Sequence, residues 1–189
     1  MKSELAEYLE YEIHELRNTK GIKKVYAFIR SMLYSPSANA IFLLRYCYVN
    51  REAKGIRKLL AKHCRRKLVN RYGIHFNLGV NSYIGRGLFL PHPCSIIFGE
   101  GVCLGKNCIV YQNVTFGAKR RNAKPDKDGR LYPIAGDNCI FYAGAVVIGP
   151  IHIGNGTQVG ANSVLITGTE NDSIYAGVPA IKKGKSNDL

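Results

Sequence analysis

The sequence predicts an all-β parallel β-helix that follows an α-helical N-terminal region, and three observations carry this prediction. Apolar residues recur at helical spacing up to Tyr72. After Asn77 they recur every six residues, often followed by glycine. The chain has 189 residues and 46% hydrophobic content, which suits one sizeable core with a small satellite. We expect a helical region over 1–72, a β-helix over 73–181 and a C-terminal tail over 182–189.

The N-terminal region is predicted to form successive helices. One predicted helix ends before Ser35-Pro36 and has its apolar face at Ile22, Val25, Ile29 and Met32. We expect Ser37 to cap the next helix.

A later predicted helix is basic and amphipathic, with one face at Ile56, Leu59, Leu60, His63 and Cys64. This pattern is typical of an ordinary surface helix with a solvated charged face. It also suits contact with an anionic membrane surface.

The charge and the cysteines limit the class of protein. The 27 Lys and Arg against 13 Asp and Glu give a net charge of +14, which favours an acidic partner, yet no nucleic-acid-binding motif is present. Six separate cysteines without a CxxC pair indicate reduced thiols. The acidic start lacks the pattern of a signal peptide. We therefore predict a cytoplasmic protein, with at most peripheral contact with the inner membrane surface.

The strongest signal is an internal repeat with a period of six residues. Its apolar positions are Leu78, Ile84 and Leu90, then Phe98, Leu104, Val110 and Phe116, then Ala135, Phe141, Val147, Ile153, Val159 and Leu165. The fifth residue of each hexad is small or apolar as well. We interpret three hexads as one triangular coil, in which each hexad supplies a short strand and a turn.

The repeat is interrupted twice, and site residues are expected at such breaks. The interval from Leu90 to Phe98 is eight residues, and His92 lies within it between two prolines. The interval from Phe116 to Ala135 is nineteen residues. We predict that residues 118–134 leave the β-helix as a basic excursion.

An ordered series of motifs resembles serine acetyltransferase and related hexapeptide-repeat acyltransferases. It comprises IGRGLFLPHPCSIIFGE, NVTFG, YAGAVVIGPIHIGNGTQVGANSVL and AGVPA, and covers roughly 73–181. The resemblance implies left-handed coils, a homotrimer, and an enzyme that moves an acetyl group from acetyl-CoA to a hydroxyl without a metal.

The resemblance also implies roles for particular residues. His92 falls where the family has its catalytic base, and Asn77 replaces an aspartate that orients the imidazole. The implied CoA contacts are Gly117, Ala143, Gly144, Gly160 and Ala161, with Lys182 and Lys183 near its phosphates. The implied acceptor contacts are Tyr132, Arg120 and Arg121.

Three departures bear on the acceptor. The first is Asn77. The second is Pro91, which stands before the histidine where the family has an acidic residue. The third is Leu131-Tyr132, which replaces an Arg-His pair of the family. We therefore expect a carbohydrate acceptor, a sugar hydroxyl in surface polysaccharide synthesis. Serine O-acetylation in cysteine biosynthesis is the alternative, and a non-enzymatic β-helix scaffold is a third interpretation.

Overall fold

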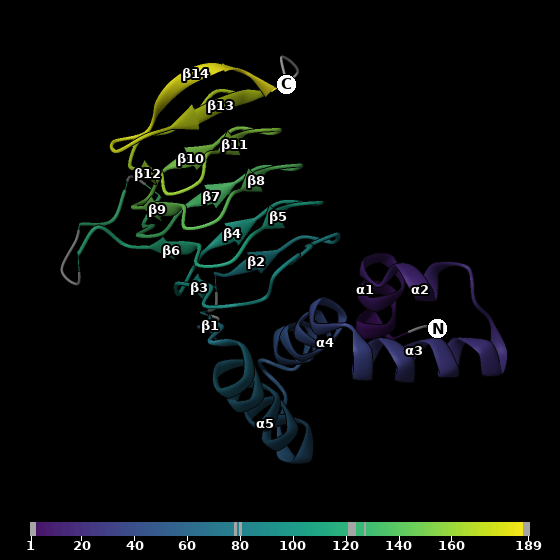
Figure 1. Ribbon diagram of the computed structural model, residues 1–189. Coiled ribbons are helices and arrows are strands. Elements are labelled where there is room, and N and C mark those ends of the chain that lie inside the picture. The colour runs from purple at the N-terminus through teal and green to yellow at the C-terminus, as the bar shows by residue number, and fades with distance from the viewer. Residues whose placement is uncertain (1–2, 78, 80, 121–123, 127, 187–189) are drawn as a thin grey trace. The chain divides into compact units, whose positions relative to one another are not determined.

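The computed structural model describes residues 3–77, 79, 81–120, 124–126 and 128–186. The chain divides into two compact units, Met1–Gly73 and Ile74–Leu189. The first unit is helical and the second is built of short strands (Figure 1). Leu78, a predicted core position, lies outside the described residues.

The helical unit consists of α1 (Glu4–Glu12), α2 (His14–Arg17), α3 (Gly21–Tyr34), α4 (Pro36–Val49) and α5 (Gly55–Tyr72). The Ser35 hydroxyl accepts a hydrogen bond from the backbone N–H of Ala38 at 3.2 Å and so caps α4. The prediction of Ser37 as this cap is wrong, because Pro36 occupies the first helical position, where its missing N–H costs nothing.

The packed face of α3 differs from the expected one. Ala27, Phe28 and Met32 contact the core formed by α1, α2 and α4, and the Phe28 and Phe42 rings meet edge to face at 5.5 Å. Ile22 and Ile29 point away from this core and are exposed. The helical period predicts the helix, but it does not decide which of two apolar faces is buried.

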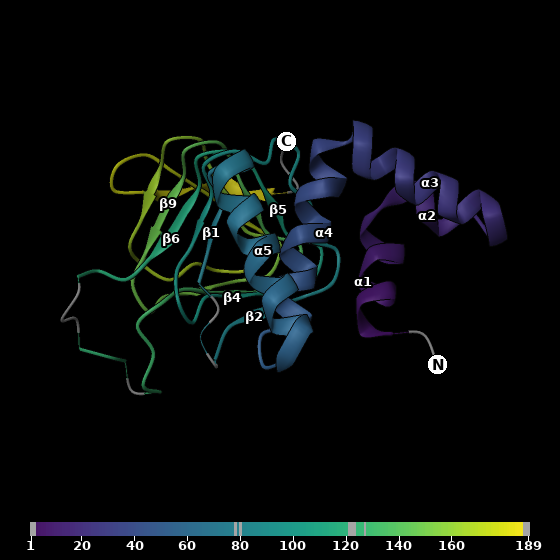
Figure 2. The ribbon, with the colours of Figure 1, turned by 90° about the horizontal axis from the view of Figure 1, so that it is seen from below.

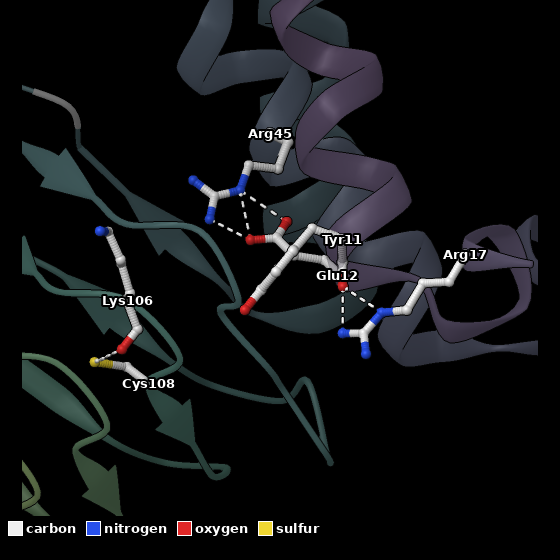
Figure 3. Close-up of polar contacts among 6 residues, drawn as sticks. All are labelled: Tyr11, Glu12, Arg17, Arg45, Lys106 and Cys108. Carbon is white, nitrogen blue, oxygen red and sulfur yellow. Dashed lines mark hydrogen bonds and ion pairs between the residues drawn. The ribbon is translucent and has the colours of Figure 1, made fainter.

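A buried ion pair joins α1 to α4. The carboxylate of Glu12 accepts hydrogen bonds from the Arg45 guanidinium, the Nε–Oε2 distance being 2.9 Å (Figure 3). Both side chains are fully buried, and the Tyr8 ring lies 4.1 Å from the guanidinium carbon. The attraction between the two charges offsets the cost of removing each of them from water.

The second unit is a parallel β-helix with three sheets, which occupy three sides in Figure 2. Sheet A contains β1 (His75–Phe76), β3 (Ile97–Phe98), β6 (Thr115–Gly117), β9 (Val146–Ile148) and β12 (Val164–Leu165). Sheet B contains β2 (Tyr83–Ile84), β4 (Cys103–Leu104), β7 (Ile134–Ala135) and β10 (His152–Ile153). Sheet C contains β5 (Ile109–Val110), β8 (Ile140–Phe141), β11 (Gln158–Val159), β13 (Ser173–Ala176) and β14 (Ile181–Lys185).

The register of the strands confirms the six-residue repeat. Phe98 pairs with Phe116, and Phe116 with Val147, in successive coils of sheet A. The rings of Phe98 and Phe116 stack at 5.6 Å. All the predicted inward positions among the described residues are buried, as are the fifth residues of the hexads. Burial of this continuous apolar column stabilises the stack.

The corners of the β-helix are tight because successive coils touch there. We name each corner by the sheets that it joins in chain order: A–B, B–C and C–A. At the B–C corner, a Cβ atom on Gly105 would lie 2.4 Å from the carbonyl oxygen of Gly136 in the next coil. Only glycine fits this approach, which explains why glycine follows so many inward residues.

The end of the chain differs from the expected tail. Residues Ile181–Lys185 form β14, which pairs antiparallel with β13 at the end of sheet C (Figure 1). The expected tail over 182–189 therefore begins as a strand that pairs with the last coil, and its final three residues lie outside the described part of the chain.

The Glu12→Gln substitution should lower the free energy of unfolding by about 3–5 kcal/mol, because it leaves the buried Arg45 cation without its counter-charge. Urea unfolding followed by far-ultraviolet circular dichroism measures this change.

Glu10→Gln is the matched control, since Glu10 pairs with Lys24 at a partly exposed site on the same unit and should cost about 1 kcal/mol or less. Equal losses for the two variants would contradict the importance of the buried pair.

Candidate functional site

His92 lies at the C–A corner, in the segment between the bridge residue Phe89 and β3. Its backbone carbonyl accepts a hydrogen bond from the N–H of Cys94 at 2.8 Å, which closes a tight turn around the buried Pro93. The imidazole is exposed. The two-residue lengthening of this hexad therefore puts a titratable side chain at an accessible corner.

Two tyrosines continue the line of rings that begins at His92. The Tyr111 ring lies 6.3 Å from the imidazole, centroid to centroid. Tyr142, one coil further, stacks on Tyr111 at 5.5 Å, and its hydroxyl lies 3.2 Å from Oε1 of Gln158. Sequence reasoning missed both tyrosines. Spacing gives no simple signal for the pair, because the excursion lengthens the interval from Tyr111 to Tyr142 to 31 residues, and only the register of the coils shows that the two rings stack.

Four of the five small residues predicted to contact CoA belong to the same corner, Gly117 being the exception. Ala143 and Gly144 follow Tyr142, and Gly160 and Ala161 occupy the equivalent turn one coil later. The backbone N–H of Asn162 donates to the Ala143 carbonyl at 2.9 Å. The structure thus brings four predicted cofactor contacts into the corner column that begins at His92.

The stacking of the coils by itself requires glycine at two of these positions. Gly144 has a positive φ of 72°, and a Cβ atom there would lie 2.2 Å from Oδ1 of Asn162. A Cβ atom on Gly160 would lie 2.9 Å from that of Ala176. Turn geometry therefore explains these glycines whether or not a ligand approaches them.

Gln112 contributes a further polar atom to this corner. Its backbone carbonyl accepts from the N–H of Gly144 at 3.0 Å. Its side-chain Oε1 is buried and has no hydrogen-bond partner within the part of the chain that the structure describes. A buried acceptor without a donor is costly, and Gln112 is another residue that sequence reasoning did not single out.

Asn77 and Tyr132 occupy a different corner from His92. Asn77 directly follows β1, and its backbone N–H donates to the Phe98 carbonyl at 3.3 Å. The Tyr132 ring packs on Gly99, close enough that a Cβ atom there would clash with it. Both lie at the A–B corner, as does Gly117 at the end of β6. Within one chain, sheet A therefore separates these residues from the C–A corner.

The excursion leaves the β-helix at the A–B corner, between β6 and β7. Arg120 is exposed, and Arg121 lies outside the described residues. Oδ1 of Asp126 accepts from the backbone N–H groups of Asp128 and Arg130 at 2.9 and 2.8 Å. The hydrogen bond from the Arg130 N–H is the main reason that the pKa of Asp126 is lowered.

Asp126 and Asp128 also approach His152 of β10, with ligand atoms within 4.8 Å of one another. Exposed acidic groups gather in this way without an ion in many proteins. The cluster by itself assigns no metal.

The two lysines after AGVPA lie on β14 and are exposed. Lys182 already has an acidic partner, because its Nζ donates to Oε2 of Glu170 at 2.6 Å. This hydrogen bond raises the pKa of Lys182. Any contact of Lys182 with a CoA phosphate would replace the Glu170 pair.

Comparison with known proteins identifies a consistent set of relatives. A serine acetyltransferase of Synechococcus elongatus is 32% identical over 96 residues, which is 51% of this chain and 37% of that protein. One of Staphylococcus aureus is 32% identical over 111 residues, 59% of this chain and 50% of that protein. No protein-family model matches the chain. The match thus spans half or less of the curated relatives.

Solved structures extend the likeness to nearly the whole chain. A serine acetyltransferase of Neisseria gonorrhoeae has a TM-score of 0.76 at 24% identity, covering 98% of this chain and 67% of that one. A serine acetyltransferase in complex with CoA has a TM-score of 0.69 at 22% identity, covering 95% of this chain and 69% of that one.

The chain is similar to serine acetyltransferases. This confirms the left-handed β-helix with an N-terminal helical region, the fold class that the sequence predicted. The expected carbohydrate acceptor in polysaccharide synthesis is wrong, because the curated relatives described above are serine acetyltransferases. The three departures misled because a changed residue removes one contact without showing which acceptor replaces the old one.

An exposed thiol beside His92 allows the corner to be probed directly. Cys94 is exposed, whereas Cys108 is buried. The hydrogen bond between Cys108 and Cys139, together with burial, raises the pKa of the Cys108 thiol. Iodoacetamide should therefore modify Cys94 at least roughly a hundredfold faster than Cys108, as measured by peptide mass spectrometry.

Cys94→Ser is the control, and it should remove the fast-reacting site without changing the slow ones. Comparable rates at Cys94 and Cys108 would contradict the described corner.

Proposed function

We propose that this protein is an acetyl-CoA-dependent acetyltransferase that transfers the acetyl group to the hydroxyl of L-serine. The observation that carries the proposal is the C–A corner, where an exposed His92 begins a column that continues through the small-residue turns at Gly144 and Gly160. The names of the similar proteins support the choice of acceptor. A CoA complex of a protein with the same fold supports acetyl-CoA as the donor.

The chemistry needs one general base. A serine hydroxyl is a weak nucleophile at neutral pH, and an imidazole can remove its proton as the oxygen attacks the thioester carbonyl. Backbone N–H groups stabilise the negative charge on the tetrahedral intermediate, and CoA leaves as the thiol. In this mechanism His92 is the base, the transfer is direct, and no metal takes part.

The CoA arm is proposed to run along the C–A corner. Its pantetheine would lie against Ala143, Gly144, Gly160 and Ala161, where no long side chain stands between the ligand and the backbone. Lys183, exposed on β14, provides a cation for the phosphates at the end of sheet C.

A homotrimer would complete the site. Sheet A keeps Asn77 and Tyr132 at one corner and His92 at the other, so one chain does not join them. Three β-helices with their A sheets facing a common axis would place the A–B corner of one copy beside the C–A corner of the next. The outer side chains of sheet A support this arrangement, because they include the apolar Ile97, Val146 and Val164.

Asn77 is proposed to orient the imidazole from the neighbouring copy. Its amide oxygen can accept the imidazole N–H, but a neutral amide stabilises an imidazolium less than a carboxylate does. Arg120 and Tyr132, both in the excursion, would contact the acceptor. The cytoplasmic location and the lack of nucleic-acid binding stay predictions of the sequence.

His92→Ala should lower kcat for CoA release with L-serine by about 10² to 10⁴, because the base acts in the transition state. Its thermal stability and CoA binding should match the wild type, since His92 is an exposed corner residue. A thiol-coupled assay and calorimetry measure the two quantities.

Asn77 variants serve as the graded control, with Asn77→Ala losing less activity than His92→Ala and Asn77→Asp gaining activity. A folded His92→Ala enzyme with unchanged kcat would overturn the mechanism. A wild-type protein that releases no CoA with L-serine would overturn the proposed function.

Subunit mixing tests the shared site. His92→Ala chains and Asn77→Trp chains should each be inactive alone, the second because an indole blocks the A–B corner. An equal mixture of the two chains, reassembled at random, should regain roughly a quarter of wild-type activity, since a site is active only where the intact corner of each variant meets the other. Native mass spectrometry confirms the mixing, and mixed trimers without activity would contradict a site between copies.

A further inference from the structure

Helix α3 exposes a stripe of large apolar side chains that the described residues of the helical unit leave uncovered. Ile22 is 89% exposed, Tyr26 67% and Leu33 66%, and Val25 and Ile29 are exposed as well. Single exposed apolar residues are ordinary on a protein surface, but a contiguous group marks an interaction site.

The stripe follows from the helical repeat. At 100° per residue, positions 22, 25, 26, 29 and 33 fall within about 100° of one another on the helix. The neighbouring sector of α3, beyond Val25, carries Met32 and Phe28, which pack on the core of the helical unit. The helix therefore has two apolar faces, one of which is occupied by its own unit.

The charges beside the stripe are mainly positive. Lys23 and Arg30 are exposed and line one hollow with Ile22 and Tyr26, and α3 contains no acidic residue. Lys24 is engaged by Glu10 on the packed side. Two carboxylates lie near the stripe: Glu15 lines a hollow of about 970 Å³ together with Tyr26 and Arg30, and Glu10, the partner of Lys24, lines another hollow together with Val25.

We propose that α3 binds an anionic lipid surface, with the stripe from Ile22 to Leu33 in the interfacial region and Lys23 and Arg30 at the headgroups. An exposed apolar face with basic residues at its border, on a helix of moderate overall hydrophobicity, is the pattern of an interfacial helix. Tyr26 and Tyr34 add the amphipathic rings that favour the interface.

The charge pattern favours lipid over a second copy of the chain. Pairing α3 with α3 of another copy would bring Lys23 and Arg30 of both copies together without an acidic residue on either helix, and like charges at such spacing repel. The helical unit as a whole carries 16 Lys and Arg against 6 Glu, which adds attraction to negative headgroups. No described helix is both long and apolar enough to cross a membrane.

Vesicle sedimentation of the full chain tests the proposal. The protein should bind phosphatidylcholine vesicles that contain phosphatidylglycerol, and bind pure phosphatidylcholine vesicles much more weakly. Ile29→Glu, at the centre of the stripe, should weaken binding to the anionic vesicles about tenfold or more. Ile181→Glu is the matched control and should bind like the wild type, because Ile181 is 57% exposed on β14 and Ile29 is 51% exposed.

A charge-reversal pair tests the basic border. Lys23→Glu combined with Arg30→Glu should weaken binding about tenfold or more, and high salt should weaken wild-type binding in the same direction. Lys106→Glu with Lys124→Glu, two exposed cations of the β-helix unit, changes the net charge equally and should have the smaller effect.

Two outcomes would overturn the proposal. Binding of Ile29→Glu that equals the wild type would show that the stripe does not contact lipid. A smaller assembly of Ile29→Glu than of the wild type, measured by sedimentation velocity without vesicles, would show that a second copy covers the stripe instead.

Discussion

Each coil of the β-helix hydrogen-bonds in register to the next, and this stacking constrains the rest of the second unit. Because the strands are only two to five residues long, no strand is stable alone, and the apolar column through Phe98, Phe116 and Val147 must hold the coils together. The same contact forbids side chains at some corners, as at Gly105. Variation is therefore confined to the outer face and to insertions at corners.

The candidate site follows from this constraint. His92 stands at a lengthened C–A corner, and stacking places Tyr111 and then Tyr142 in line with it. The long excursion emerges at the A–B corner, where Tyr132 is held against Gly99. Rigid coils keep these two groups on opposite edges of sheet A. A shared site between copies is the arrangement that would let both groups act on one acceptor.

The helical unit is stabilised differently, because its stability depends on which faces of its helices pack together. The buried pair of Glu12 and Arg45 ties α1 to α4, and Phe28 fixes the inner face of α3. With this face occupied, the outer stripe of α3 has no place in the core of its own unit. The helical unit thus uses apolar residues both for its core and for a stripe at its surface.

The sequence alone determined the core of the β-helix, because a six-residue period fixes which side chain of each short strand points inward. It also located His92, since a broken period marks a corner with freedom to vary. Only the tertiary structure decided what lies beside His92. The register pairs residue 75 with 97, 97 with 115 and 115 with 146, so the coils differ in length, and neighbours across coils depend on every earlier insertion. For the same reason the period did not show that Asn77 stands at the opposite edge of sheet A. The helical period of α3 could not reveal which face is exposed, because that choice belongs to the helices packed against it.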